Sequence, residues 1–218
     1  LIGLVLKAVF THINILLVML ISFVMLSVAG WEILSRQHRK LKGWWGFGIS
    51  TGSLFISSFL VTLLALIIIV QADPWYHPQY AIPLLGMLLG NTMSGIAIAL
   101  DNLTHNAWQQ RGQIEARLML GHEWQQAIGE TRRNALRTGL IPIINAMAAA
   151  GVVSLPGMMT GQILAGSPPM EAAKYQILIL FLIAAGTGLG SVAAVWLGSG
   201  RLFDERARLR LDTCDSRG

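Results

Sequence analysis

The chain is poor in charged residues and almost free of cysteine. Of its 218 residues, 12% are Asp, Glu, Lys or Arg, which is about half the share found in soluble domains. A soluble core of this size would need far more polar surface, so we exclude a single soluble globular domain. The one cysteine, Cys214, excludes an intramolecular disulfide framework and any metal site built from several cysteines.

The sequence also lacks the motifs of common hydrolases and ATPases. His122-Glu123 is not followed by the second histidine of an HExxH metalloprotease motif. A G-x-x-x-x-G-K-[ST] phosphate-binding loop is absent too, so this chain does not hydrolyse ATP in the Walker manner by itself. We therefore expect no catalytic residues and no cofactor bound by this chain. The sequence does not identify which residues would bind a metal ion.

Long apolar runs dominate the chain. Hydrophobic residues make up 54% of it, and the mean hydropathy is +0.58. Five stretches are long enough to cross about 30 Å of hydrocarbon, and the bilayer requires them to be helices because their backbone groups need internal partners. Leu1–Phe10 is half as long and predicts a truncated N-terminal half-span. The five full spans are predicted at Ile13–Leu34, Gly48–Val70, Tyr80–Leu100, Gly139–Ala165 and Ala172–Leu197.

The basic residues predict the orientation of this all-α, polytopic membrane helix bundle. Fourteen of the sixteen Lys and Arg residues lie in Ser35–Phe47, in Asp101–Thr138 and after Gly200, whereas the loops between these segments hold none. Basic loops stay on the cytoplasmic side, so we place these segments and the C-terminus inside. The net charge of +5 then reflects topology, and we expect the lipid bilayer rather than nucleic acid as its partner.

The connection over residues 102–137 is too long for a turn, and its sequence predicts a helix. It contains one apolar stripe at spacings of three and four. Two interpretations remain open: an amphipathic helix that lies on the headgroups, or a helix that docks into a cytoplasmic partner. The stripe consists of Ala116, Leu120, Trp124, Ala127 and Ile128.

Two stretches combine small residues with prolines, amides and methionines. Gly86, Gly90 and Gly95 would let helices approach closely. Pro156-Gly157 would interrupt the fourth span, and interrupted helices point to a substrate path. Packing and hydrogen bonds between helices are the competing interpretation, and thioethers suit Cu(I) better than hard cations. The candidates for the path are Asn91, Asn145, Met158, Met159 and Gln162.

A resemblance to a known family adds to this interpretation. Glu115-Ala116-Arg117-x-x-x-Gly121, followed by Ile141-Pro142, resembles the EAA-type loop of ABC transporter membrane subunits. Together with the runs 82–91, 154–166 and 169–177, it resembles the FetB-type family of ABC permeases, which is implicated in bacterial iron export and has plant relatives linked to aluminium tolerance.

The resemblance implies a transport subunit of the bacterial inner membrane that exports metal ions such as iron. It would work as a homodimer with a separate cytoplasmic ABC ATPase, which binds ATP and Mg. Residues 1–200 would form the permease domain, with a cytoplasmic coupling region at 102–137, and residues 201–218 a basic tail. An alternative is a stand-alone secondary carrier driven by an ion gradient. The implied ATPase-docking residues are Glu115, Ala116, Arg117, Gly121 and His122.

Overall fold

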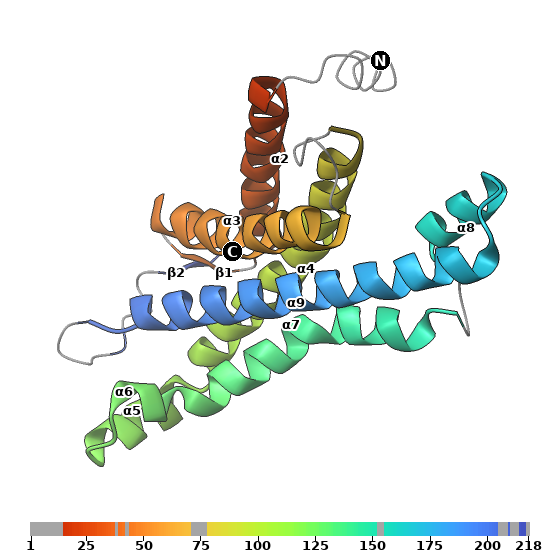
Figure 1. The fold of residues 1–218 in the computed structure, drawn as a ribbon. Helices are drawn as coiled ribbons and strands as arrows, with labels where there is room; N and C mark the ends of the chain where they lie inside the picture. Colours follow the sequence, from red (N-terminus) through yellow and green to blue (C-terminus); the bar gives the residue numbers. More distant parts are fainter. Residues whose placement is uncertain are drawn as a thin grey trace.

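The computed structural model describes residues 15–37, 39–41, 44–70, 78–151, 155–204, 209 and 214–216, most of them helical (Figure 1). The predicted half-span at Leu1–Phe10 lies outside the described residues. The elements are α2 (Ile15–Arg36), β1 (Arg39–Leu41), α3 (Trp44–Leu64), the π-helix η1 (Ala65–Val70), α4 (Pro78–Gln109), α5 (Arg111–Met119), α6 (Trp124–Ala127), α7 (Gly129–Ala149), α8 (Gly157–Leu164), α9 (Pro169–Arg201) and β2 (Cys214–Ser216). The short strands β1 and β2 pair in antiparallel fashion.

Four helices of the described chain are long and apolar enough to cross a bilayer. They lie at Ile15–Arg36, Gly46–Ile68, Tyr80–Gln109 and Pro169–Arg201. Their outer faces carry large exposed apolar side chains, a surface that suits hydrocarbon rather than water. The prediction of a helical membrane bundle is therefore confirmed, with four such helices in place of the five expected.

The remaining predicted span, Gly139–Ala165, is not among these four helices, and the structure divides it. α7 ends at Ala149, and α8 begins at Gly157. Gly151 has a φ of +80°, a left-handed conformation that glycine adopts without strain. Pro156, which lacks a backbone N–H, is the N-cap of α8. The predicted interruption at Pro156-Gly157 is thus confirmed, and it divides the segment into two helices.

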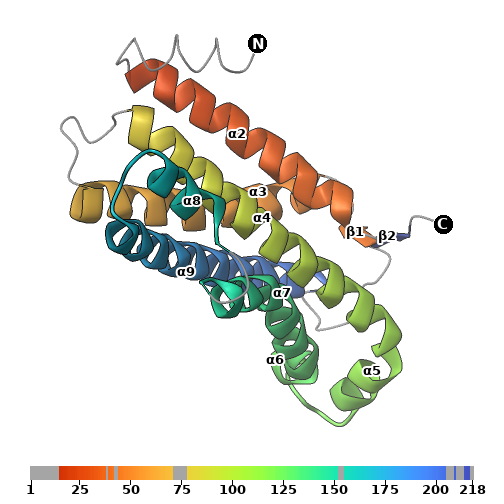
Figure 2. The same ribbon diagram turned by 90° about the vertical axis from the view of Figure 1, so that its right-hand side faces the viewer.

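α4 forms the centre of the bundle. It packs against α2, α3, α7 and α9 (Figures 1 and 2). Its inward residues Leu88, Ile96 and Leu100 are at most 1% exposed. Every other long helix is therefore positioned by its contact with α4, and a displacement of one of them must be accommodated along this central helix.

Close approaches between the helices occur at glycines. A Cβ added to Gly190 of α9 would lie 2.8 Å from Cγ2 of Thr92 on α4. A Cβ added to Gly139 of α7 would lie 2.7 Å from Cβ of Ala99 and 2.8 Å from the backbone oxygen of Gly95, both on α4. Any larger residue would force the backbones apart at these crossings, so glycine sets the spacing of α4 to both neighbours.

Candidate functional site

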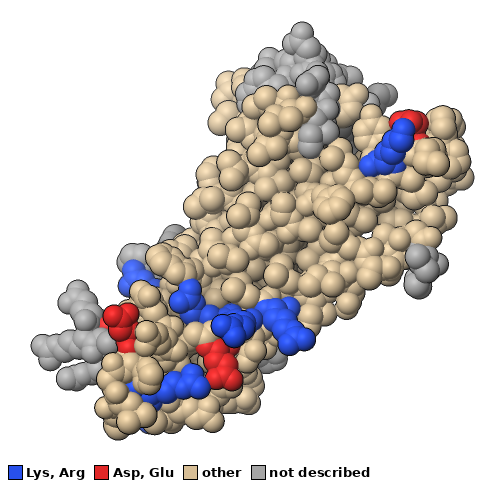
Figure 3. All heavy atoms as spheres, turned by 60° about the horizontal axis from the view of Figure 1, so that its bottom comes forward, with Lys and Arg blue, Asp and Glu red and all other residues tan. Residues whose placement is uncertain are grey.

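Charged side chains gather at one end of the molecule. Figure 3 shows most Lys, Arg, Asp and Glu side chains there, separated by a broad uncharged surface from a smaller charged group. We call this end the charged end. It is formed by the last turns of α4, by α5 and α6, by the first turns of α7 and by the last turns of α9. At the opposite end, Lys174 Nζ lies 2.9 Å from Glu171 Oε1 near the start of α9. The sequence predicts that the charged end is cytoplasmic.

At the charged end, α5 and α6 form a helical hairpin, residues 111–127 (Figure 2). Gly121 lies in its turn with a φ of +87°. The His122 backbone N–H donates to Arg117 O at 3.2 Å, and the Gly121 N–H donates to Leu118 O at 3.0 Å. This is the hydrogen-bond pattern by which a glycine ends an α-helix. The chain therefore reverses at Gly121 instead of continuing as one helix.

The reversal makes the predicted single apolar stripe wrong. Ala127 and Ile128 are buried, at 1% and 0% exposure, whereas Leu120 is 79% exposed. Its neighbour Met119 is 87% exposed. A stripe requires a constant rotation per residue, and the turn at Gly121 interrupts that rotation. The result is an exposed apolar pair, Met119 and Leu120, which we call the hairpin tip.

The predicted docking residues all lie on this hairpin. Ala116, Gly121 and His122 are exposed. Glu115 is half-buried and lies 3.5 Å from Arg111 Nε in an ion pair along α5. Arg117 is also half-buried, and its side chain contacts α7. The structure thus exposes three of the five predicted docking residues and leaves the other two half-buried.

Polar contacts tie the hairpin to α7. Arg117 Nη2 donates to Glu130 Oε2 at 2.9 Å, and Thr131 Oγ1 donates to Gln110 Oε1 at 3.0 Å. Thr131 is 1% exposed and its hydrogen bond is part-buried, whereas the more exposed ion pair between Arg117 and Glu130 contributes little to stability. Together they fix the base of the hairpin to the first turn of α7.

An aromatic contact ties the hairpin to α9 as well. The rings of Trp124 on α6 and Phe203, just beyond α9, lie 5.4 Å apart in a tilted arrangement. Ile114 and Ile128 are buried in the same apolar cluster. The hairpin is therefore packed against two long helices, and a force on its tip would be transmitted to both.

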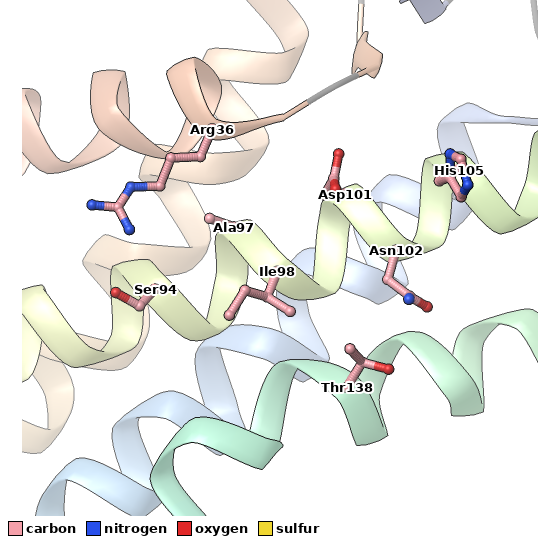
Figure 4. Close-up of a pocket in the computed structure, with 8 residues that line it drawn as sticks. All are labelled: Arg36, Ser94, Ala97, Ile98, Asp101, Asn102, His105 and Thr138. Carbon is pink, nitrogen blue, oxygen red and sulfur yellow. The ribbon is translucent and has the colours of Figure 1, made fainter.

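A cavity of about 250 Å³ lies beside α4 towards the charged end (Figure 4). Four of its polar residues come from α4, and Figure 4 shows Asp101 and Asn102 on different sides of that helix. Arg36, at the end of α2, is held by Glu32, with Nε 3.0 Å from Oε1. The cavity is lined by Arg36, Ser94, Ala97, Ile98, Asp101, Asn102, His105 and Thr138.

The structure distributes the predicted path residues over three helices. Asn91 is exposed on α4, and its Nδ2 donates to Met87 O at 2.8 Å. Asn145 is exposed on α7. Met158, Met159 and Gln162 lie half-buried on α8, at the end of the bundle away from the hairpin (Figures 1 and 2). Asn91 lies one turn from the cavity residue Ser94, and the structure does not gather the five into one site.

The residues predicted for helix packing differ in their contacts. A Cβ at Gly86 would lie 3.2 Å from Met25 Cε, and Gly95 lies at the crossing of α4 with α7 and α9. Around Gly90, nothing described lies within 4 Å of an added Cβ. Pro156 and Gly157 lie at the start of α8.

Two features were not found from the sequence. One is the glycine series of α9, at Gly186, Gly190 and Gly198, which a search for small residues four and eight positions apart would have shown. The other is the cavity, because Asn102, His105 and Thr138 lie beyond the predicted apolar runs. In the part of the chain that the structure describes, no group of three or more His, Cys, Asp or Glu could hold a metal ion.

Comparison with known proteins decides the family. A family model described as an uncharacterised protein family, UPF0014, matches residues 1–203. The chain belongs to this family. No solved structure matches it.

Three known proteins show how similar this chain is to its relatives. The UPF0014 membrane protein slr1647 of Synechocystis is 39% identical over 95% of this chain and 80% of its own length. The Probable iron export permease protein FetB of Escherichia coli is 34% identical over 71% of this chain and 62% of its own length. The Protein ALUMINUM SENSITIVE 3 of Arabidopsis thaliana is 31% identical over 90% of this chain and 70% of its own length. The resemblance to FetB-type proteins is thereby confirmed.

Proposed function

We propose that this chain is the membrane subunit of an ABC transporter that exports metal cations from the bacterial cytoplasm. A separate ATPase subunit would bind ATP and Mg and supply the energy. The observation that carries this proposal is the hairpin: it protrudes at the charged end, exposes an apolar tip and is fixed to two long helices. The name of the FetB relative supports the metal cargo and the direction.

The hairpin supplies a mechanism for coupling. An ATPase subunit that binds Met119 and Leu120 would pull on the first turn of α7 through the contacts of Arg117 and Thr131. α7 crosses α4 at Gly139, so this tight contact would act as the pivot. Movement of α7 about the pivot would shift its interrupted end near α8 and open the path alternately to each side.

Exposed amides on α4 and α7 support a homodimer. Asn91 on α4 and Asn145 on α7 are exposed in one copy, although amides are costly to leave against lipid. Gly90, beside Asn91, leaves open space among the described residues. A second copy would cover this surface, and the two amides would then line a path between copies. The end of this path away from the hairpin would be lined by Met158, Met159 and Gln162.

Reconstitution with and without an ATPase tests the proposal. We expect proteoliposomes that hold this chain and its ATPase to move Fe²⁺ only when ATP and Mg are supplied on the side of the charged end. The chain by itself should move none, even with an imposed proton or sodium gradient. Gradient-driven flux by the chain by itself would contradict the proposal and identify a secondary carrier.

A further inference from the structure

We propose that the cavity beside α4 is a loading site for a hydrated divalent cation, with Asp101 and His105 as its direct ligands. The proposal rests on the proposed function for its cargo, but the binding it asserts requires neither ATP nor a partner. None of the predicted path residues lines this cavity, so the site is additional to them.

The two proposed ligands lie one helical turn apart on α4. His105 Nε2 lies 2.9 Å from Gln109 Nε2, and a cation bound at this nitrogen would replace that contact. Asp101 and His105 are four residues apart on α4, so their side chains leave the helix one above the other. Figure 4 shows both on the same side of α4. Carboxylate and imidazole are common ligands of divalent transition metals. The Asn102 amide and the Thr138 hydroxyl lie at the same cavity and can bind waters of the hydration shell.

The size of the cavity suits a cation that keeps most of its water. On the measure used for this cavity, one water molecule needs about 10–15 Å³, so six waters need roughly 60–90 Å³. The cavity holds about 250 Å³. Two protein ligands and several retained waters give moderate affinity, and a transport site must bind its cargo weakly enough to release it.

The surrounding chemistry selects the class of metal. None of the described residues that line the cavity carries sulfur. Soft Cu(I) prefers thiolate and thioether ligands, whereas oxygen and nitrogen donors suit Fe²⁺, Mn²⁺ and Co²⁺. Arg36 adds a positive charge to the lining, but its guanidinium is paired with Glu32 at 3.0 Å. The site therefore fits a borderline or hard divalent cation.

Titration of the purified, tag-free chain with Co²⁺ tests the site, because histidine ligation changes the visible absorption of this ion. We expect saturable binding, weakened about tenfold or more by Asp101→Asn and by His105→Gln. The matched control Glu171→Gln removes a carboxylate from the opposite end and should leave the dissociation constant unchanged. Its carboxylate is already paired with Lys174.

Several results would overturn the assignment. Absence of saturable Co²⁺ binding by the wild-type chain would do so, as would unchanged binding in both variants. His105 is exposed, so His105→Gln should fold even if Asp101→Asn does not, and its binding constant then decides. Cu(I) bound more tightly than Co²⁺ and insensitive to both substitutions would place a metal site elsewhere. Since no ATPase is present, failure here leaves the proposed function standing, and failed ATP-driven flux leaves this site standing.

Discussion

Replacing Gly139 with leucine is expected to prevent α7 from packing against α4 and to leave little folded protein. The new Cβ would lie 2.7 Å from Ala99 Cβ and 2.8 Å from the Gly95 backbone oxygen. A backbone atom cannot move aside as a flexible side chain can, so we expect a loss of about 3 kcal/mol or more in the free energy of unfolding. The yield of monodisperse protein and its melting temperature in detergent measure this effect.

Gly188→Leu is the matched control for that experiment. Gly188 lies in the middle of a membrane helix, α9, and nothing described lies within 4 Å of a Cβ added there. The same substitution should therefore change the free energy of unfolding by less than about 0.5 kcal/mol. If Gly139→Leu proved as stable as Gly188→Leu, the proposed pivot of α7 on α4 would not exist.

The second large effect is expected at the hairpin tip. Met119→Glu together with Leu120→Glu should leave the fold intact, because both side chains are almost fully exposed, at 87% and 79%. If the tip inserts into a pocket of the ATPase, loss of these anchors should cost about 2 kcal/mol of binding energy or more, which is a roughly thirtyfold weaker dissociation constant. Titration of the purified ATPase against the detergent-solubilised chain measures the change.

Met170→Glu is the corresponding control at the other end of the bundle. Met170 is 70% exposed at the start of α9, so it resembles the tip residues in chemistry and exposure but not in position. Its substitution should not alter ATPase binding. Equal affinity of the tip variant and the wild-type chain would show that the ATPase docks elsewhere.

The membrane helices could be predicted because composition alone determines them. A run of some twenty apolar residues has few options other than a spanning helix, and α2, α3, α4 and α9 follow from such runs. The break before α8 was also readable, since Pro156 lacks a backbone donor. The end of α7 was not, because the left-handed conformation of Gly151 depends on the path the chain takes there.

The site was harder to predict because it depends on tertiary structure. The spacing of Leu120 and Trp124 suits one helix face, and only the turn at Gly121 separates an exposed tip from a buried base. The cavity joins Arg36 and Thr138 to α4, although these residues are far apart in the sequence. These residues become neighbours because α2 and α7 cross α4. The spacing of apolar residues along one segment does not predict such crossings.

The central claim is that the hairpin is a lever on the cytoplasmic face, and cysteine labelling tests it most directly. Cys214 is the one native cysteine, so Cys214→Ser gives a background in which Leu120→Cys or Met170→Cys supplies a single thiol. A membrane-impermeant maleimide should label Leu120→Cys in inside-out vesicles and not in intact cells, with the reverse result for Met170→Cys. Labelling of Leu120→Cys from outside the cell, or from neither side, would contradict the account.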